Sequence, residues 1–184
     1  MTPAPPRPWP WTRTSPRPPR SSGRRSQAPA PQARRERVSV QAFVGLGGNV
    51  GDVAAAFASA VARMDALPAT QLLRVSRHYR TPAWGMAAQP DFLNAVAVLE
   101  TTLPARDLLD ALLAIERAHG RDRASETRWG PRTLDLDLLL YGDAVVDEPG
   151  LRVPHPHLHE RAFALRPMLE IAPVDAEVID SAME

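Results

Sequence analysis

The residues best suited to chemistry lie together between Arg128 and Asp137, in the run Arg-Trp-Gly-Pro-Arg-Thr-Leu-Asp-Leu-Asp. The end of this run alternates in polarity, which predicts a strand with Asp135 and Asp137 on one face and leucines on the other. Two neighbouring carboxylates repel each other unless a cation lies between them or both reach water. Carboxylate oxygens suit Mg²⁺, which takes its remaining ligands from water and substrate phosphates. The pair therefore indicates either a magnesium site or a solvated edge strand with two outward acids.

The arginines near this pair favour the magnesium interpretation. Arg132 precedes Asp135 by three residues, and Arg121, Arg123 and Arg128 lie upstream in a polar stretch. Guanidinium groups bind phosphate oxygens through paired hydrogen bonds. The combination is typical of a metal-bound polyphosphate such as a nucleoside triphosphate. Every basic residue is arginine, which excludes a lysine Schiff base and a P-loop lysine.

The near-neutral net charge of +1 hides two very different parts of the chain. Residues 1–37 contain ten prolines and nine arginines against a single acid, whereas the other 147 residues contain 13 arginines and 20 acids. We therefore expect residues 1–37 to be a disordered extension and residues 38–184 to form one domain. No apolar run is long enough for a secretory signal or a membrane span, and the absence of cysteine excludes disulfides and thiolate catalysis.

Hydrophobic periodicity predicts the order strand, helix, strand, strand, helix, strand. Strands are expected over 38–44, 72–79, 92–100 and 134–141. One helix is expected between Asp52, its N-cap, and Pro68, and another between Pro104 and Gly120. A hairpin around Gly142 and a helical stretch over about 159–165 follow. This order predicts the α+β class and a ferredoxin-like βαββαβ sandwich, an antiparallel sheet with helices on its faces.

A glycine-rich segment follows the first predicted strand, from Gly45 to Gly51. A strand, a glycine turn and a helix also make up dinucleotide-binding sites, but Val50 occupies a position that such a motif gives to glycine or alanine. We therefore expect these glycines to allow a tight backbone turn before the helix. Backbone amides that line a ligand remain the alternative.

The third predicted strand carries Phe92 and Asn94 on one face, because they are two residues apart. An asparagine on so apolar a strand needs partners, since an unpaired buried amide costs about 1–3 kcal/mol. Nearby backbone groups are one kind of partner. A flat heterocycle is the other, with its ring stacked on Phe92 and its edge bonded to the amide. Phe163 is a candidate for the opposite stacking face.

Three histidines, His155, His157 and His159, alternate with other residues near the end of the chain and suggest zinc. Pro156 restricts such a segment to an edge strand, and no nearby acid is arranged as a fourth ligand. We therefore expect a polar turn that leads into a helix, with His155 in contact with a phosphate.

The chain from about Val40 to Pro173 resembles the 6-hydroxymethyl-7,8-dihydropterin pyrophosphokinase family of folate biosynthesis. The resemblance rests on Glu116 and on blocks of matching residues: Gly-Gly-Asn at 47–49, Tyr-Arg-Thr-Pro at 79–82, Gln-Pro-Asp-Phe-Leu-Asn at 89–94, the run at 128–137, Val-Pro-His at 153–155 and Arg-Ala-Phe at 161–163. It implies transfer of pyrophosphate from ATP to the pterin hydroxymethyl group, with release of AMP.

The resemblance also implies roles for individual residues. Two Mg²⁺ ions would be held by Asp135 and Asp137. Catalysis would involve Arg121, Arg132 and Asp137. The pterin would contact Thr81, Pro82, Ala83, Trp84, Phe92, Asn94 and Phe163. ATP, the co-substrate, would contact Glu116, Arg123, Trp129, Arg132, His155 and Arg161. The expected protein is a cytoplasmic monomer whose partners are small molecules, without nucleic acid or membrane.

Two other classes of protein are compatible with parts of the sequence. A ferredoxin-like sheet with a basic extension also occurs in RNA-binding modules, which should show an aromatic-rich strand. The histidines alternatively suggest a metal-dependent hydrolase, which should contain stoichiometric zinc.

Overall fold

The computed structural model describes residues 38–83, 89–121, 130–156 and 158–172. In chain order the elements are β1 (Val40–Gly48), α1 (Val53–Asp65), β2 (Thr70–Val75), β3 (Tyr79–Thr81), β4 (Phe92–Thr101), α2 (Ala105–Ala118), β5 (Asp135–Tyr141), β6 (Val146–Glu148), β7 (Leu151–Val153), the short 3₁₀ helix η1 (Leu158–Glu160) and α3 (Ala162–Ile171). The predicted extension, residues 1–37, lies outside the described residues.

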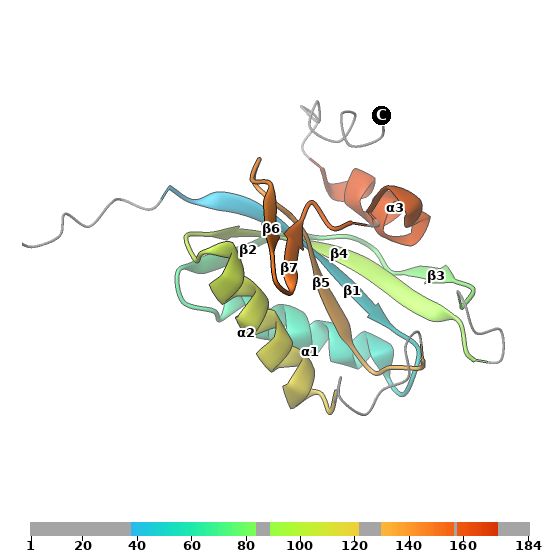
Figure 1. Cartoon of the computed structure of the whole chain (residues 1–184). Helices are drawn as coiled ribbons and strands as arrows, with labels where there is room; N and C mark the ends of the chain where they lie inside the picture. The colour runs from blue at the N-terminus through green and yellow to red at the C-terminus, as the bar shows by residue number, and fades with distance from the viewer. Residues whose placement is uncertain (1–37, 84–88, 122–129, 157, 173–184) are drawn as a thin grey trace, which may run out of the picture. The chain divides into compact units, whose positions relative to one another are not determined.

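The main sheet is antiparallel, with strand order β2-β4-β1-β5 and with β3 paired to β4 beyond the end of β2. β1 and β4, the two central strands, pair over their whole shared length, from Val40 opposite Thr101 to Gly48 opposite Leu93. This order and the helices between the strands confirm the predicted ferredoxin-like sandwich (Figure 1). A separate two-stranded sheet, β6 and β7, follows β5.

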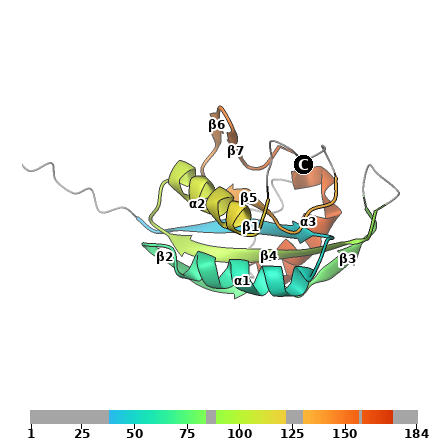
Figure 2. The ribbon, with the colours of Figure 1, turned by 90° about the horizontal axis from the view of Figure 1, so that it is seen from below.

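Alternate residues of the strands point into two separate cores. One face packs on α1 and α2 through Leu46, Leu99 and Leu136, among others, which are at most 3% exposed. The other face packs on α3, where Val96 and Met168 are almost fully buried. Both views place α3 beside β3 and β4 (Figures 1 and 2). No helix in the described ranges is long and apolar enough to cross a membrane.

The helix boundaries follow the predicted signals. The Asp52 carboxylate accepts a hydrogen bond from the Ala55 backbone N–H at 3.0 Å, as expected of an N-cap. Pro104 occupies the N-cap position of α2, whose predicted stripe of Leu108, Leu112 and Ile115 is buried. These features were predictable because a helix period of 3.6 residues is local to the chain.

The predicted glycine turn is wrong, because β1 continues through Gly48. Pairing with β4 on one side and β5 on the other holds this segment as a central strand. The turn comes later, at Gly51, whose φ of 72° lies in the left-handed region that favours glycine.

The single strand predicted over 72–79 is interrupted. Ser76 separates β2 from β3, and its hydroxyl accepts a hydrogen bond from the Val96 backbone N–H at 3.0 Å. Because this hydroxyl replaces a backbone carbonyl, the chain leaves the regular register and resumes pairing with β4 at Tyr79. A polar residue at one position thus divides an otherwise continuous pattern.

The end of the chain also differs from the prediction. The hairpin turns at Gly150, with φ of 75°, and not around Gly142. The final helix ends at Ile171 and contains Pro167, because Pro167 and Met168 are buried in the core beneath it. Tertiary burial therefore extends a helix that the local sequence predicted to be shorter.

Candidate active site

The predicted alternation of β5 is confirmed. Leu134 precedes the strand, and Leu136 and Leu138 lie within it; all three are buried on the side of α1 and α2. Asp135 and Asp137 therefore point to the opposite side of the sheet, where their side chains are 20% and 28% exposed. Both carboxylates are accessible to a ligand that approaches the face covered in part by α3.

Glycines of the central strand β1 form the floor beside these acids. Gly47 pairs with Asp135 on one side and with Asn94 on the other, and Gly45 pairs with Asp137. A Cβ atom built on Gly47 would lie 3.7 Å from Asn94 Oδ1 and 3.7 Å from Asp135 Cβ. Because Gly47 has no side chain, the space between the Asp135 side chain and the Asn94 amide stays open.

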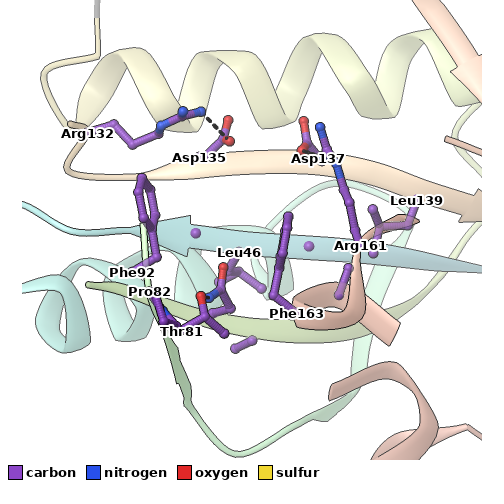
Figure 3. A pocket seen from close by; sticks show the side chains of 15 residues that line it. Leu46, Thr81, Pro82, Phe92, Arg132, Asp135, Asp137, Leu139, Arg161 and Phe163 are labelled. Atoms are coloured by element: carbon purple, nitrogen blue, oxygen red, sulfur yellow. Dashed lines mark hydrogen bonds and ion pairs between the residues drawn. The ribbon is translucent and has the colours of Figure 1, made fainter. Parts of the chain in front are cut away.

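A cavity of about 120 Å³ lies above this floor. Phe92 from β4 and Phe163 from α3 stand on opposite sides of it (Figure 3). Arg132 Cζ lies 5.5 Å from the centre of the Phe92 ring, and Arg161 Cζ lies 5.7 Å from that of Phe163. Two aromatic faces over a floor of glycine backbone suit a flat ring system.

Asn94 forms the polar edge of the cavity. It is 5% exposed, and its Nδ2 donates to Thr81 Oγ1 at 2.9 Å and to the Tyr79 backbone oxygen at 3.4 Å. The Asn94 amide therefore has hydrogen-bond partners in nearby parts of the chain, including one backbone oxygen, which was the first of the two explanations offered for this residue. Its Oδ1 faces the position above Gly47, so the amide also presents a polar atom towards the cavity.

Arginines neutralise both aspartates in this structure. Asp135 pairs with Arg132 at 2.8 Å and with Arg121, and Asp137 pairs with Arg161 at 3.0 Å. With Glu116, which also pairs with Arg121, three cations and three anions balance in formal charge. The guanidinium groups can bind phosphate oxygens through paired hydrogen bonds.

Arg121 also forms a buried ion pair with Glu116, the glutamate predicted to contact ATP. Their side chains are 6% and 2% exposed, and Arg121 Nη1 lies 2.8 Å from Glu116 Oε1. The same oxygen accepts a hydrogen bond from the Leu136 backbone N–H at 2.7 Å. Glu116 thus joins the end of α2 to β5 from below, and it lines neither the cavity nor the cleft described next.

A second, larger cleft of about 700 Å³ lies between α2, β5 and the β6–β7 hairpin. Its apolar wall includes Leu109 and Leu113, and its rim includes Arg152 and His155. Asp137 lines this cleft and also lines the first cavity. Among the residues that line the two spaces, Asp137 is the one that they share.

The structure brings most of the predicted site residues to these two spaces. The residues around the first cavity are Thr81, Pro82, Phe92, Asn94, Arg132, Asp135, Asp137, Arg161 and Phe163. Arg161, predicted to contact ATP, lies on this side and pairs with Asp137. Ala83 lines neither space. Trp84, Arg123 and Trp129 lie outside the described residues.

The histidine interpretation receives no support from the described residues. His155 lies half-buried at the rim of the cleft, and its backbone N–H donates to the Leu139 oxygen at 2.9 Å. His159 is exposed and lies 3.4 Å from Glu160, whereas His157 lies outside the described residues. In the described ranges, no three His, Cys, Asp or Glu side chains converge on a point that would hold a metal.

Asn49, the last residue of the Gly-Gly-Asn motif, has a structural role that the sequence patterns did not predict. Asn49 Oδ1 accepts from the Arg132 backbone N–H, and Asn49 N donates to the Arg132 oxygen, both at 2.9 Å. Its Nδ2 donates to Gln89 Oε1 and to the Pro90 oxygen. Asn49 therefore joins three segments around Arg132. An asparagine directly after a strand was the only signal in the sequence.

Replacing Gly47 by valine is expected to raise the KM for the flat substrate about tenfold, with little change in thermal stability. Valine suits the strand backbone at this position, but its methyl groups would fill the space between Asn94 and Asp135. Steady-state kinetics and thermal unfolding measure the two effects. Gln71→Val, on the exposed edge strand β2, is the control. An unchanged KM in Gly47→Val would show that the floor does not limit the ligand.

An α+β sandwich whose cavity and cleft share Asp137, with arginines paired to this residue and to Asp135, is typical of an enzyme that transfers a phosphate-containing group between two substrates. The chain belongs to the 7,8-dihydro-6-hydroxymethylpterin-pyrophosphokinase family, whose model matches residues 43–173. It is therefore a pyrophosphokinase that acts on hydroxymethyldihydropterin in folate biosynthesis, and the family uses ATP as co-substrate.

Two curated relatives illustrate the similarity. The 2-amino-4-hydroxy-6-hydroxymethyldihydropteridine pyrophosphokinase of Pseudomonas aeruginosa is 47% identical over 131 residues, which cover 71% of this chain and 80% of the relative. The enzyme of the same name from Methylorubrum extorquens is 47% identical over 133 residues, which cover 72% and 83%. The family and the enzyme class predicted from the motifs are confirmed.

The RNA-binding alternative does not fit the described sheet. The open part of its face carries one aromatic residue of a central strand, Phe92, beside Gly45, Gly47 and two aspartates. RNA-binding sheets instead stack two or three bases on aromatic residues of their central strands.

Proposed function

We propose that the pterin ring binds in the cavity between Phe92 and Phe163. The proposal is supported by the two aromatic walls, the glycine floor and the single polar edge formed by Asn94 and Thr81. The walls provide stacking, and the edge provides directional hydrogen bonds. In this position the hydroxymethyl group of the pterin would point along β5 towards the aspartates.

ATP is proposed to bind in the larger cleft, with its polyphosphate directed to Asp137. The observation that carries this assignment is that Asp137 lines both spaces. A group transfer needs its two substrates on either side of one point, so that the attacking oxygen and the β-phosphorus are in line. His155 and Arg152, which line the same cleft, would provide polar or positively charged groups for the polyphosphate.

Asp135 and Asp137 are the residues that would hold Mg²⁺. Their oxygen atoms are hard ligands, they share one face of a strand, and both side chains are partly exposed. Two carboxylates without a further acidic ligand in the described ranges suit Mg²⁺, which keeps water and phosphate oxygens in its shell. When bound, the metal supplies charge neutralisation of the polyphosphate. The number of ions, two in the prediction, stays a proposal.

The arginines are proposed to exchange partners when ATP binds. Arg132 and Arg161 pair with the aspartates, and each lies over an aromatic ring. Carboxylates engaged by metal would release these guanidinium groups to the phosphate oxygens. The hydroxymethyl oxygen would then bond to the β-phosphorus and lose its proton to solvent, while the bond from the β-phosphorus to the α-phosphate oxygen breaks and AMP leaves with that oxygen. The pterin carries away the pyrophosphoryl group.

The test is product analysis with the purified chain, ATP, Mg²⁺ and 6-hydroxymethyl-7,8-dihydropterin. We expect AMP and the pterin diphosphate in equal amounts, and no AMP when either the pterin or Mg²⁺ is omitted. ADP in place of AMP would show phosphoryl transfer and contradict the proposed point of attack. Equal AMP release without pterin would indicate hydrolysis of ATP and reject the pterin site.

Residues 1–37 are proposed to have no part in this reaction. Deleting residues 1–36 is expected to leave kcat and both KM values within about twofold of the full chain, because the family match begins at residue 43. Parallel kinetics of the two forms, with their thermal unfolding, provide the measurement. A large loss of rate in the shortened chain would contradict this view.

A cytoplasmic location and a monomeric state likewise stay proposals.

A further inference from the structure

The C-terminal end of α3 is fixed to the segment between β2 and β3 by a single carboxylate, that of Glu170. Its Oε2 accepts from the Tyr79 hydroxyl at 2.8 Å, and its Oε1 from Arg77 Nε at 3.0 Å. The Arg77 backbone N–H also donates to it, at 3.2 Å to the nearer oxygen. The Tyr79 hydroxyl, with Arg77 beside it, holds the pKa of the Glu170 carboxyl below its usual range. We refer to these three residues as the Glu170 clamp.

The clamp lies outside both substrate spaces, yet it joins two elements that each contribute residues to the lining of the cavity. The first turn of α3 carries Phe163, and β3 ends at Thr81, which is two residues beyond Tyr79. β3 is only three residues long, so pairing with β4 alone gives it few hydrogen bonds. The distance between Phe163 and Thr81 therefore depends on what holds α3 against β3.

Apolar packing sets the height of α3 above the sheet but restrains its sliding less. Met168 and Ile171 pack on β4 and β5, and such contacts are not directional. The hydrogen bonds of Glu170 are directional. They come from the Arg77 backbone N–H, the Tyr79 hydroxyl on β3 and the Arg77 side chain, which is 81% exposed. The clamp thus fixes the position of α3 along the sheet.

We propose that Glu170 is a positioning residue for the pterin: it holds α3 and β3 together so that Phe163 and Thr81 face the same bound ring. The proposal rests on the assignment of the pterin to this cavity. Without the clamp, forms with a displaced α3 become populated, and only part of the molecules is competent to bind. The apparent Kd then rises by the inverse of that fraction.

The effect is expected to be larger for the pterin than for ATP. None of the residues that line the ATP cleft lies on α3 or β3, but Arg161, a proposed phosphate ligand, is the N-cap of α3, so the KM for ATP should rise less than the KM for the pterin. At saturating pterin the bound form is restored, so kcat should stay close to that of the wild type. A pterin KM that rises more than the KM for ATP separates a positioning role from a general loss of structure.

The experiment compares Glu170→Ala, Glu170→Gln and Tyr79→Phe, with Asp110→Asn on the exposed side of α2 as the matched loss of one charge. Pterin Kd is measured by fluorescence titration, both KM values by kinetics, and folding by thermal unfolding. We expect Glu170→Ala to raise the pterin Kd about tenfold and Glu170→Gln less, because the amide oxygen still accepts from Tyr79. Tyr79→Phe combined with Glu170→Ala should add little to Glu170→Ala alone.

Two results would contradict the proposed positioning role of Glu170. One is an unchanged pterin Kd in both Glu170 variants. The other is a rise in the KM for ATP, or a fall in kcat, as large as the rise for pterin, since this would indicate general destabilisation. Failure of the proposed function is a separate result, because the wild-type chain itself would then neither bind pterin nor form AMP.

Discussion

Replacing Asp137 by alanine is expected to lower kcat for pyrophosphoryl transfer at least about a thousandfold while leaving the chain folded. Asp137 lines both the cavity and the cleft, so its loss removes an oxygen ligand at the proposed point of transfer. It also leaves Arg161 without its carboxylate partner, 3.0 Å away in the wild type. Rate measurements at saturating substrates, with thermal unfolding as the measure of folding, test this prediction.

Two further variants separate charge from position. Asp137→Asn keeps the volume and one oxygen but loses the negative charge, and should be nearly as inactive. Asp143→Asn removes an exposed charge just beyond the end of the same strand and should keep the wild-type rate. Activity of Asp137→Ala within tenfold of the wild type would mean that the metal and the transfer lie elsewhere.

Replacing Glu116 by alanine is expected to lower the free energy of unfolding by about 3 kcal/mol, the largest loss of stability among the variants described here. The side chain is almost fully buried, and its removal breaks the ion pair with Arg121. It also leaves the buried Leu136 N–H without its acceptor. Arg121 keeps Asp135 as a partner, which places the loss at the lower end of the range for a broken buried pair. Denaturant unfolding measures it.

Glu116→Gln provides the control for this prediction, because the amide oxygen still accepts from Leu136 but carries no charge. We expect an intermediate loss of stability. The same variant examines the predicted contact of Glu116 with ATP: a stable protein with a raised KM for ATP would favour that contact. A loss below about 1 kcal/mol in Glu116→Ala would show that the buried pair contributes little.

The parts of the site that were predictable depend on short-range patterns. The alternation of β5 placed Asp135 and Asp137 on one face because side chains of a strand alternate regardless of its neighbours. Asn94 stood out because an amide in an apolar strand needs partners, and the structure supplies Thr81 and Tyr79. The strand order followed from the sequence of elements and from the short connections between them.

Other features depend on contacts between distant segments. The sequence shows glycines after a strand but does not show whether the chain turns there or the strand continues. Pairing with both β4 and β5 keeps Gly47 in the strand, where it forms part of the floor of the cavity. The arginines were predicted as phosphate ligands, yet the fold gives each of the described ones an acidic partner. Such ion pairs can be recognised only once the groups are known to be close in space.

Taken by itself, the sequence determined the α+β class, the shared face of the two aspartates and, through its motifs, the pterin pyrophosphokinase family. The tertiary structure alone decided that the cavity and the cleft share Asp137, that Glu116 is buried beneath β5, and that Glu170 joins α3 to β3. The reason is physical: periodicity and capping act over a few residues, whereas cavities and buried ion pairs arise where segments far apart in the chain come together.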